Sequence, residues 1–126
     1  MTIEEVLRAQ LVAGAPSYGG RVYPVQAAQG AAYPYLTYNQ VSEINEHAMG
    51  SDPNVLLARW QVSAWGDTYA KAKIAANDAA TALSRYRATV SGLEVFDVFK
   101  ELEMDLFDPE ALAYHVVVDF LVMHRN

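Results

Sequence analysis

The sequence contains no cysteine, which removes several kinds of chemistry before any pattern is considered. Without thiols the chain can form no disulfide, use no cysteine nucleophile and build no cysteine-ligated zinc site. Basic residues are also scarce, since Lys and Arg total 9 against 15 Asp and Glu, and the formal net charge is −6. A nucleic-acid groove concentrates Lys and Arg, so this composition argues against one.

Long apolar runs are missing as well. No stretch approaches the roughly 20 apolar residues that a membrane-spanning helix needs, so we expect no membrane partner. What is present is the composition of a folded domain, with 52% hydrophobic and 19% charged residues in a chain of 126 residues. That length suits one hydrophobic core, and we expect residues 1–126 to form a single domain.

The clearest pattern is a strand that changes into a helix at Gly66. Residues 56–65 alternate between two kinds of side chain, as in a β-strand with one buried face. After the glycine, Asp67 or Thr68 can serve as a helix N-cap. Small and apolar residues then recur every three or four positions, which predicts an amphipathic helix that ends near Arg87.

The remaining elements follow the same rules. Thr2 and Glu5 have the spacing of a capping box, and Gly14 ends the helix that they begin. Residues 43–54 are polar, have no period and are predicted to form a loop or a mobile hairpin tip. Strands are predicted at residues 21–23, 35–42, 93–107 (broken once) and 112–124.

The last predicted strand is largely apolar on both faces, so both faces should be covered. Two helices can cover one face. The other face is covered either by a neighbouring subunit or by the sheet curling over into a partial barrel, and the pattern does not choose between them. Together the elements predict an α+β domain, with a mixed or antiparallel sheet of four to six strands and two helices packed on one face.

The sequence shows no catalytic or metal-binding constellation. The three histidines, His47, His115 and His124, lie far apart in the sequence. His115 and Asp119 share a strand face but lie about 13 Å apart along it, beyond hydrogen-bond reach. We therefore predict no catalytic, cofactor-binding or metal site and no enzyme activity. The alternative is a small ligand-binding or catalytic α+β domain whose site has no recognisable pattern.

Two groups of side chains remain. Carboxylates crowd residues 94–110, and alternation places four of them on one strand face, which we expect to be solvated. These four are Asp97, Glu101, Glu103 and Asp105. The chain also has eight tyrosines, several of them between residues 18 and 35. We expect these tyrosines to serve packing first and subunit contact second.

Four sequence blocks carry a family resemblance. They are TIEEVLRAQLVA, GGRVYPVQAAQGAAYPYLTYNQVS, ARWQVSAWGDTYAKAKIAANDAATAL and LFDPEALAYHVVVDFLVMHR. In this order and at these spacings, the chain resembles the small tail-completion proteins of long-tailed bacteriophages, which include tail terminators and head–tail joining proteins. The resemblance covers most of the chain and extends to prophage and gene-transfer particles.

The resemblance implies a structural virion-assembly protein that caps the completed tail tube and joins it to the head as a ring, hexameric in that family. Its partners would be further copies of itself, the tail-tube protein and a head-completion or connector protein, with no cofactor. DNA would pass through the ring without specific binding. The protein would be made in the host cytoplasm and reside at the tail–head junction of the virion.

The same resemblance gives the side chains candidate roles. The four carboxylates on the predicted acidic face would point into the lumen, where they repel phosphate. The candidate contact residues with a subunit or the tail are Tyr18, Tyr23, Tyr33, His47, Met49, Asp52 and Asp119.

Overall fold

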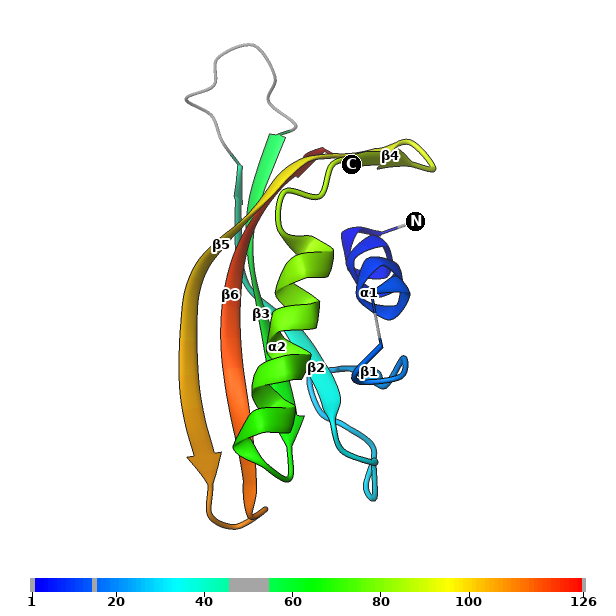
Figure 1. The fold of residues 1–126 in the computed structure, drawn as a ribbon. Coiled ribbons are helices and arrows are strands. Elements are labelled where there is room, and N and C mark those ends of the chain that lie inside the picture. The colour runs from blue at the N-terminus through cyan, green and yellow to red at the C-terminus, as the bar shows by residue number, and fades with distance from the viewer. Residues whose placement is uncertain (1, 15, 46–54, 126) are drawn as a thin grey trace.

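The computed structural model describes residues 2–14, 16–45 and 55–125 (Figure 1). These residues confirm the predicted α+β fold. The helices are α1 (Ile3–Ala13) and α2 (Tyr69–Leu83). The strands are β1 (Val22–Pro24), β2 (Tyr35–Asn45), β3 (Val55–Gly66), β4 (Ala88–Val90), β5 (Leu93–Asp108) and β6 (Ala113–Arg125).

The strands form one sheet in the order β1-β2-β3-β6-β5-β4. β1 runs parallel to β2 and every other neighbouring pair is antiparallel, so the sheet is mixed. The long strands bend together like a half-barrel around α1 and α2, which both cover the concave face (Figure 1). We refer to the opposite face, which carries the odd-numbered residues of β6, as the helix-free face.

The change from β3 to α2 takes place where the sequence predicts it. Thr68 is the N-cap, and its side chain accepts a hydrogen bond of 3.2 Å from Lys71 N. Gly66 is required because a Cβ at this position would lie 2.6 Å from Ala72 N. The first turn of α2 is therefore pressed against the end of β3, and no larger residue fits between them.

The core lies between the two helices and the concave face of the sheet. Small side chains on α2 have no exposed surface, which lets this helix approach the sheet closely. The opposing sheet residues are large. The buried residues of α2 are Ala72, Ala75, Ala76, Ala79 and Leu83, and those of α1 are Ile3, Val6, Leu7 and Leu11. They pack with Trp60, Val62, Val98, Val118, Phe120 and Val122 of the sheet, among others.

Two element boundaries differ clearly from the sequence prediction, and one strand was not predicted. α2 ends at Leu83 rather than near Arg87, because Arg85 has a φ of 61° and its N–H donates to Val98 O of β5. The chain then forms the short strand β4, which the sequence did not indicate. β2 continues to Asn45, so the first three residues of the predicted 43–54 loop belong to a strand. The rest of that predicted loop, residues 46–54, lies outside the described residues.

β6 is apolar on both faces, as the sequence indicates, but its two faces are covered differently. On the concave face, Val116, Val118 and Phe120 are at most 1% exposed. On the helix-free face Val117 is buried, whereas Leu121 and Met123 are only partly covered. The sheet curls around the helices, so its curl does not cover the helix-free face, and the partly exposed apolar side chains there remain open.

Trp60 and Trp65 offer a matched test of the strand faces. Trp60 is 5% exposed and belongs to the core, whereas Trp65 lies on the helix-free face. We expect Trp60→Ala to lower the free energy of unfolding by about 3–5 kcal/mol, because it leaves a cavity. Trp65→Ala should have a clearly smaller effect. Denaturant unfolding of both variants measures the difference, and equal losses would show that the face assignment is wrong.

Candidate assembly surfaces

An aromatic ladder crosses the helix-free face. Tyr35, Trp65 and His115 are direct neighbours on β2, β3 and β6. Their rings stack, with centroids 6.1 Å apart for Tyr35–Trp65 and 4.1 Å apart for Trp65–His115. Trp65 Nε1 donates to Thr37 Oγ1 at 3.1 Å. Burial lowers the pKa of His115 against the opposing effect of Asp108, so the imidazole stacks as a neutral ring at pH 7.

Two of the predicted contact tyrosines extend this ladder beyond β2. Tyr33 stacks on Tyr35 with centroids 5.4 Å apart, and Tyr23 meets the same ring edge-on at 5.9 Å. Both side chains are half-buried, so each keeps surface for a further contact. Beside them runs a groove of about 480 Å³, lined by residues 25–31 and by the ladder itself. The aromatic side chains and the groove together form one contoured, partly apolar surface patch.

Tyr18 does not belong to this surface, which corrects its predicted role as a contact residue. Its side chain is fully buried. Its hydroxyl donates to Leu11 O at 2.6 Å and also lies 3.1 Å from Gly14 O. Burial, assisted by the charge of Asp78, raises the pKa of Tyr18 to about 12. Tyr18 therefore binds the free carbonyls at the end of α1 and serves folding.

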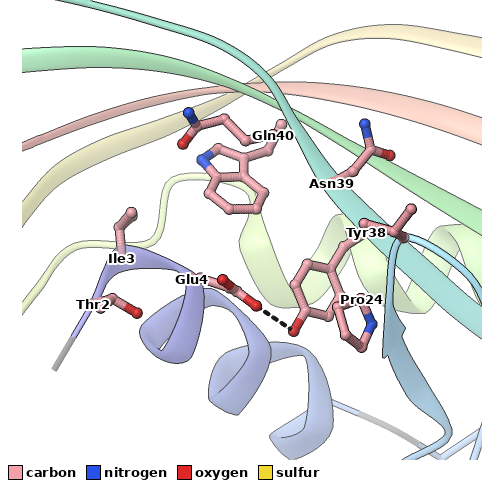
Figure 2. A pocket seen from close by; sticks show the side chains of 9 residues that line it. Thr2, Ile3, Glu4, Pro24, Tyr38, Asn39 and Gln40 are labelled. Atoms are coloured by element: carbon pink, nitrogen blue, oxygen red, sulfur yellow. Dashed lines mark hydrogen bonds between the residues drawn. The ribbon is translucent and has the colours of Figure 1, made fainter.

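A second pocket, of about 420 Å³, lies between the start of α1 and the outer part of β2 (Figure 2). Glu4 accepts a hydrogen bond of 3.2 Å from the Tyr38 hydroxyl (Figure 2). Burial and then the Glu4 charge raise the pKa of Tyr38. Trp60 also lines the pocket, and its Nε1 has no hydrogen-bond partner among the described residues. The pocket borders Asn39 and Gln40 at the edge of the sheet.

The four predicted lumen carboxylates do not share one face, which corrects the sequence prediction. Register shifts in β5 between Val95 and Asp97 and between Lys100 and Leu102 interrupt the alternation. Beyond the second shift, Glu103 and Asp105 lie opposite the core residues of β6 and therefore on the helix side. Simple alternation fails here because it assumes an unbroken ladder.

On the helix side, Lys73 of α2 joins two of these carboxylates. Lys73 Nζ lies 2.6 Å from Glu103 Oε2 and 3.0 Å from Asp105 Oδ1. Lys100 reaches Glu103 at 2.8 Å, and Tyr69 donates to Asp105 at 2.8 Å. Hydrogen bonds from Lys100 and Lys73 lower the pKa of Glu103, and those from Lys73 and Tyr69 lower the pKa of Asp105. These contacts hold α2 against β5.

The other two carboxylates bind arginines elsewhere. Glu101 pairs with Arg59 of β3 at 2.9 Å, on the helix-free face. Asp97 is buried and lies 3.0 Å from both Arg85 and Arg87. Burial alone would raise the pKa of Asp97, but the hydrogen bonds from Arg87 and from Val98 N outweigh it and lower the pKa. All four carboxylates thus have cationic partners within the chain.

The acidic segment also holds an apolar stripe that the sequence reasoning missed. Leu102, Met104 and Leu106 lie on the helix-free face and are 46%, 44% and 41% exposed. Their period of two was the available signal, but the carboxylates between them dominated the interpretation. Asp119 of β6, a predicted contact residue, lies on the same face opposite Gln61 and Leu102. The other predicted contacts, His47, Met49 and Asp52, lie outside the described residues.

The described residues assemble no recognisable catalytic geometry around the histidines. His115 lies in the aromatic ladder, four residues along β6 from Asp119. His124 has no exposed surface and lies 3.5 Å from Glu43. Within residues 2–14, 16–45 and 55–125, no group of three His, Cys, Asp or Glu side chains could hold a metal ion. In the same part of the chain, no helix is long and apolar enough to cross a membrane.

Comparison with known proteins identifies the family. The model of a family described as tail completion protein gp17 matches residues 5–125. The chain belongs to this family. A solved chain from the virion of a native gene transfer agent particle has a TM-score of 0.76 over 98% of this tail completion protein and 95% of its own length. Its sequence is 16% identical, so it shows a shared fold. No curated protein matches the sequence.

The ion pairs of Lys73 should make the stability of this tail completion protein depend on pH. The pKa values of Glu103 and Asp105 are lowered from 4.5 and 3.8, so their stabilisation is present above these values and is lost as the pH falls. We expect Lys73→Met to be less stable than the wild type at pH 7, with the deficit shrinking towards pH 3. Denaturant unfolding at both pH values measures it.

Lys71→Met is the matched control, because the Lys71 ammonium group pairs with the neighbouring Asp67 in an exposed contact of 3.2 Å. Its effect at pH 7 should be smaller than that of Lys73→Met. A deficit for Lys73→Met that stays constant from pH 7 to pH 3 would contradict the assigned pairing.

Proposed function

We propose that this tail completion protein caps the finished tail tube and joins it to the head as a ring, hexameric when assembled. The observation that carries the proposal is the family match, which spans residues 5–125 and so covers nearly the whole chain. The shared fold with a chain of a gene transfer agent virion supports it. The role is structural, and the protein acts by binding partners without catalysing a reaction.

A ring requires heterologous contacts, in which one surface of each subunit docks on a different surface of the next. A specific contact of this kind buries about 800 Å² per partner. Tyr23 and Tyr33 on the aromatic patch are the described candidates for contact with a subunit or the tail. Asp119 lies on the helix-free face, between β3 and β5, and remains a candidate for contact with the tail. His47, Met49 and Asp52 remain candidates by sequence. Tyr18 is excluded by its burial.

The helix-free face is the one that we assign to the channel. The two helices add a second layer on one side of the sheet only, and an extra layer fits more easily on the wider, outer side of a ring. Glu101 lies on the helix-free face, and Asp97 pairs in register with Met123 there. Glu103 and Asp105 face the helices and are therefore withdrawn from the lumen.

The passing DNA would meet few free cations on this face. Arg59 is bound to Glu101, and Arg125 is bound to Glu94. Because affinity for DNA comes largely from Lys and Arg at phosphates, a lining whose guanidinium groups already bind carboxylates lets DNA pass without gripping it. The remaining partners are the tail-tube protein on one side and a head-completion or connector protein on the other. The site of action is the tail–head junction of the virion, after synthesis in the host cytoplasm.

Deletion of the gene tests this function. Without the cap, filled heads and tails should accumulate separately, and tails of abnormal length should be visible by electron microscopy. The wild-type gene supplied in trans should restore joined particles, which controls for effects on neighbouring genes. Normal infectious particles from the deletion strain would overturn the proposed function.

A further inference from the structure

Two of the long strands have outer edges that the sheet leaves open. β1 pairs with β2 only at Leu36–Tyr38, and β4 pairs with β5 only at Leu93–Val95. Within the described part of the chain, no strand pairs with the outer edge of β2 at residues 39–44 or of β5 at residues 99–108. Open edges of this kind are templates for pairing with another chain.

Both open edges also keep exposed apolar side chains. Val41 and Ile44 on β2 are 51% and 59% exposed. Leu102, Met104 and Leu106 lie along the open part of β5. Monomeric proteins usually protect a long edge with charges that face the approaching strand. Here the nearby carboxylates are already bound to cations of the same chain, which reduces that protection.

The strand directions of the two edges are compatible. The strands β2, β3, β6 and β5 alternate in direction, so β2 and β5 of one subunit run oppositely. Subunits related by rotation about a ring axis keep their strand directions relative to that axis. The β5 edge of one subunit would therefore meet the β2 edge of the next as an antiparallel pair, which continues the pattern of the sheet.

The positions of the open stretches also fit a closed barrel. The middle of the β2 stretch, at Ser42, is in line with Leu121 of β6, and the middle of the β5 stretch, at Met104, is in line with Val117. If the middle of the β5 stretch lies beside the middle of the next subunit's β2 stretch, each subunit is displaced along the strand direction by about four residues relative to its neighbour. Each subunit is four strands wide. With ~3.3 Å per residue and ~4.8 Å per strand, the strands tilt by about 35°. Barrels tilt their strands by roughly 35–45°.

We propose that the β5 edge, residues 99–108, of each subunit pairs with the β2 edge, residues 39–44, of a second copy of this chain. The sheets then join into one continuous barrel, to which each subunit contributes β2, β3, β6 and β5. The inference rests on the proposed ring and names its subunit contact. A hexamer would close roughly 24 strands, more than the 16–18 of porins, which already leave an aqueous channel.

Cross-linking tests the pairing, and because this chain has no cysteine, an introduced thiol is unique within it. Ser42→Cys and Met104→Cys place exposed thiols on the two edges. Each variant is expressed in the deletion strain, alone, mixed or combined in one chain, and assembled tails are treated with a short bismaleimide. The mixed single variants should give a cross-linked dimer, and the double variant should give a ladder that ends at the ring size. Neither single variant should cross-link alone.

Ile74→Cys supplies the matched control. Ile74 is 54% exposed but lies on α2, which covers the face of the sheet opposite to Ser42, so its mixture with Ser42→Cys should give no dimer. Dimers from Met104→Cys alone would indicate a two-fold β5–β5 contact and overturn the proposal. Rings visible on tails but without edge cross-links would also overturn it, while leaving the proposed function intact. Absence of any ring on tails would instead overturn the proposed function.

A charge on the edge provides a second, independent test. Met104→Lys introduces the residue that natural edge strands use against pairing. We expect at least a tenfold loss of joined particles, with an unchanged unfolding midpoint for the purified protein. Ile74→Lys places the same charge on exposed α2 and should leave the particle yield unchanged. A wild-type yield from Met104→Lys would contradict the edge pairing.

Discussion

The close packing of α2 on the sheet is the constraint on which the rest of the structure depends. Ala72, Ala75, Ala76 and Ala79 have no exposed surface, so the backbone of α2 lies near the strands without large side chains in between. Large residues such as Trp60 then fill the remaining space from the sheet side. Because α1 packs on the same side, one face of the sheet becomes the core and the other is left without helices.

Electrostatic contacts between α2 and β5 stabilise this arrangement. Lys73 links α2 to Glu103 and Asp105 of β5, while Asp97 holds the chain just after α2 through Arg85 and Arg87. Such partly exposed pairs contribute modestly to stability, and their larger effect is to fix where β5 lies relative to the helix. They also use carboxylates that would otherwise have repelled another chain at the edge of the sheet.

In the proposed function the domain stays separate until a tail is complete, and such a domain benefits from contacts that are weak singly and strong when a ring closes. Open strand edges have this property, because the backbone groups are satisfied by water in the monomer and by a neighbour in the assembly. The short strands β1 and β4 limit the exposed length at each side of the sheet. The aromatic ladder through Trp65 adds a rigid surface that loses little entropy on contact.

The sequence by itself determined the elements that carry their own local signals. The alternation of β3, the Thr68 cap and the alanine stripe of α2 all depend on residues close together in the chain, so they could be predicted. The family resemblance could also be recognised in the sequence, because it rests on four sequence blocks in a fixed order. Only the tertiary structure decided the bulges of β5, the end of α2 and the partners of the acidic residues. Those features depend on Arg59, Lys73 and Val98, whose contacts come from distant parts of the sequence and leave no period in it.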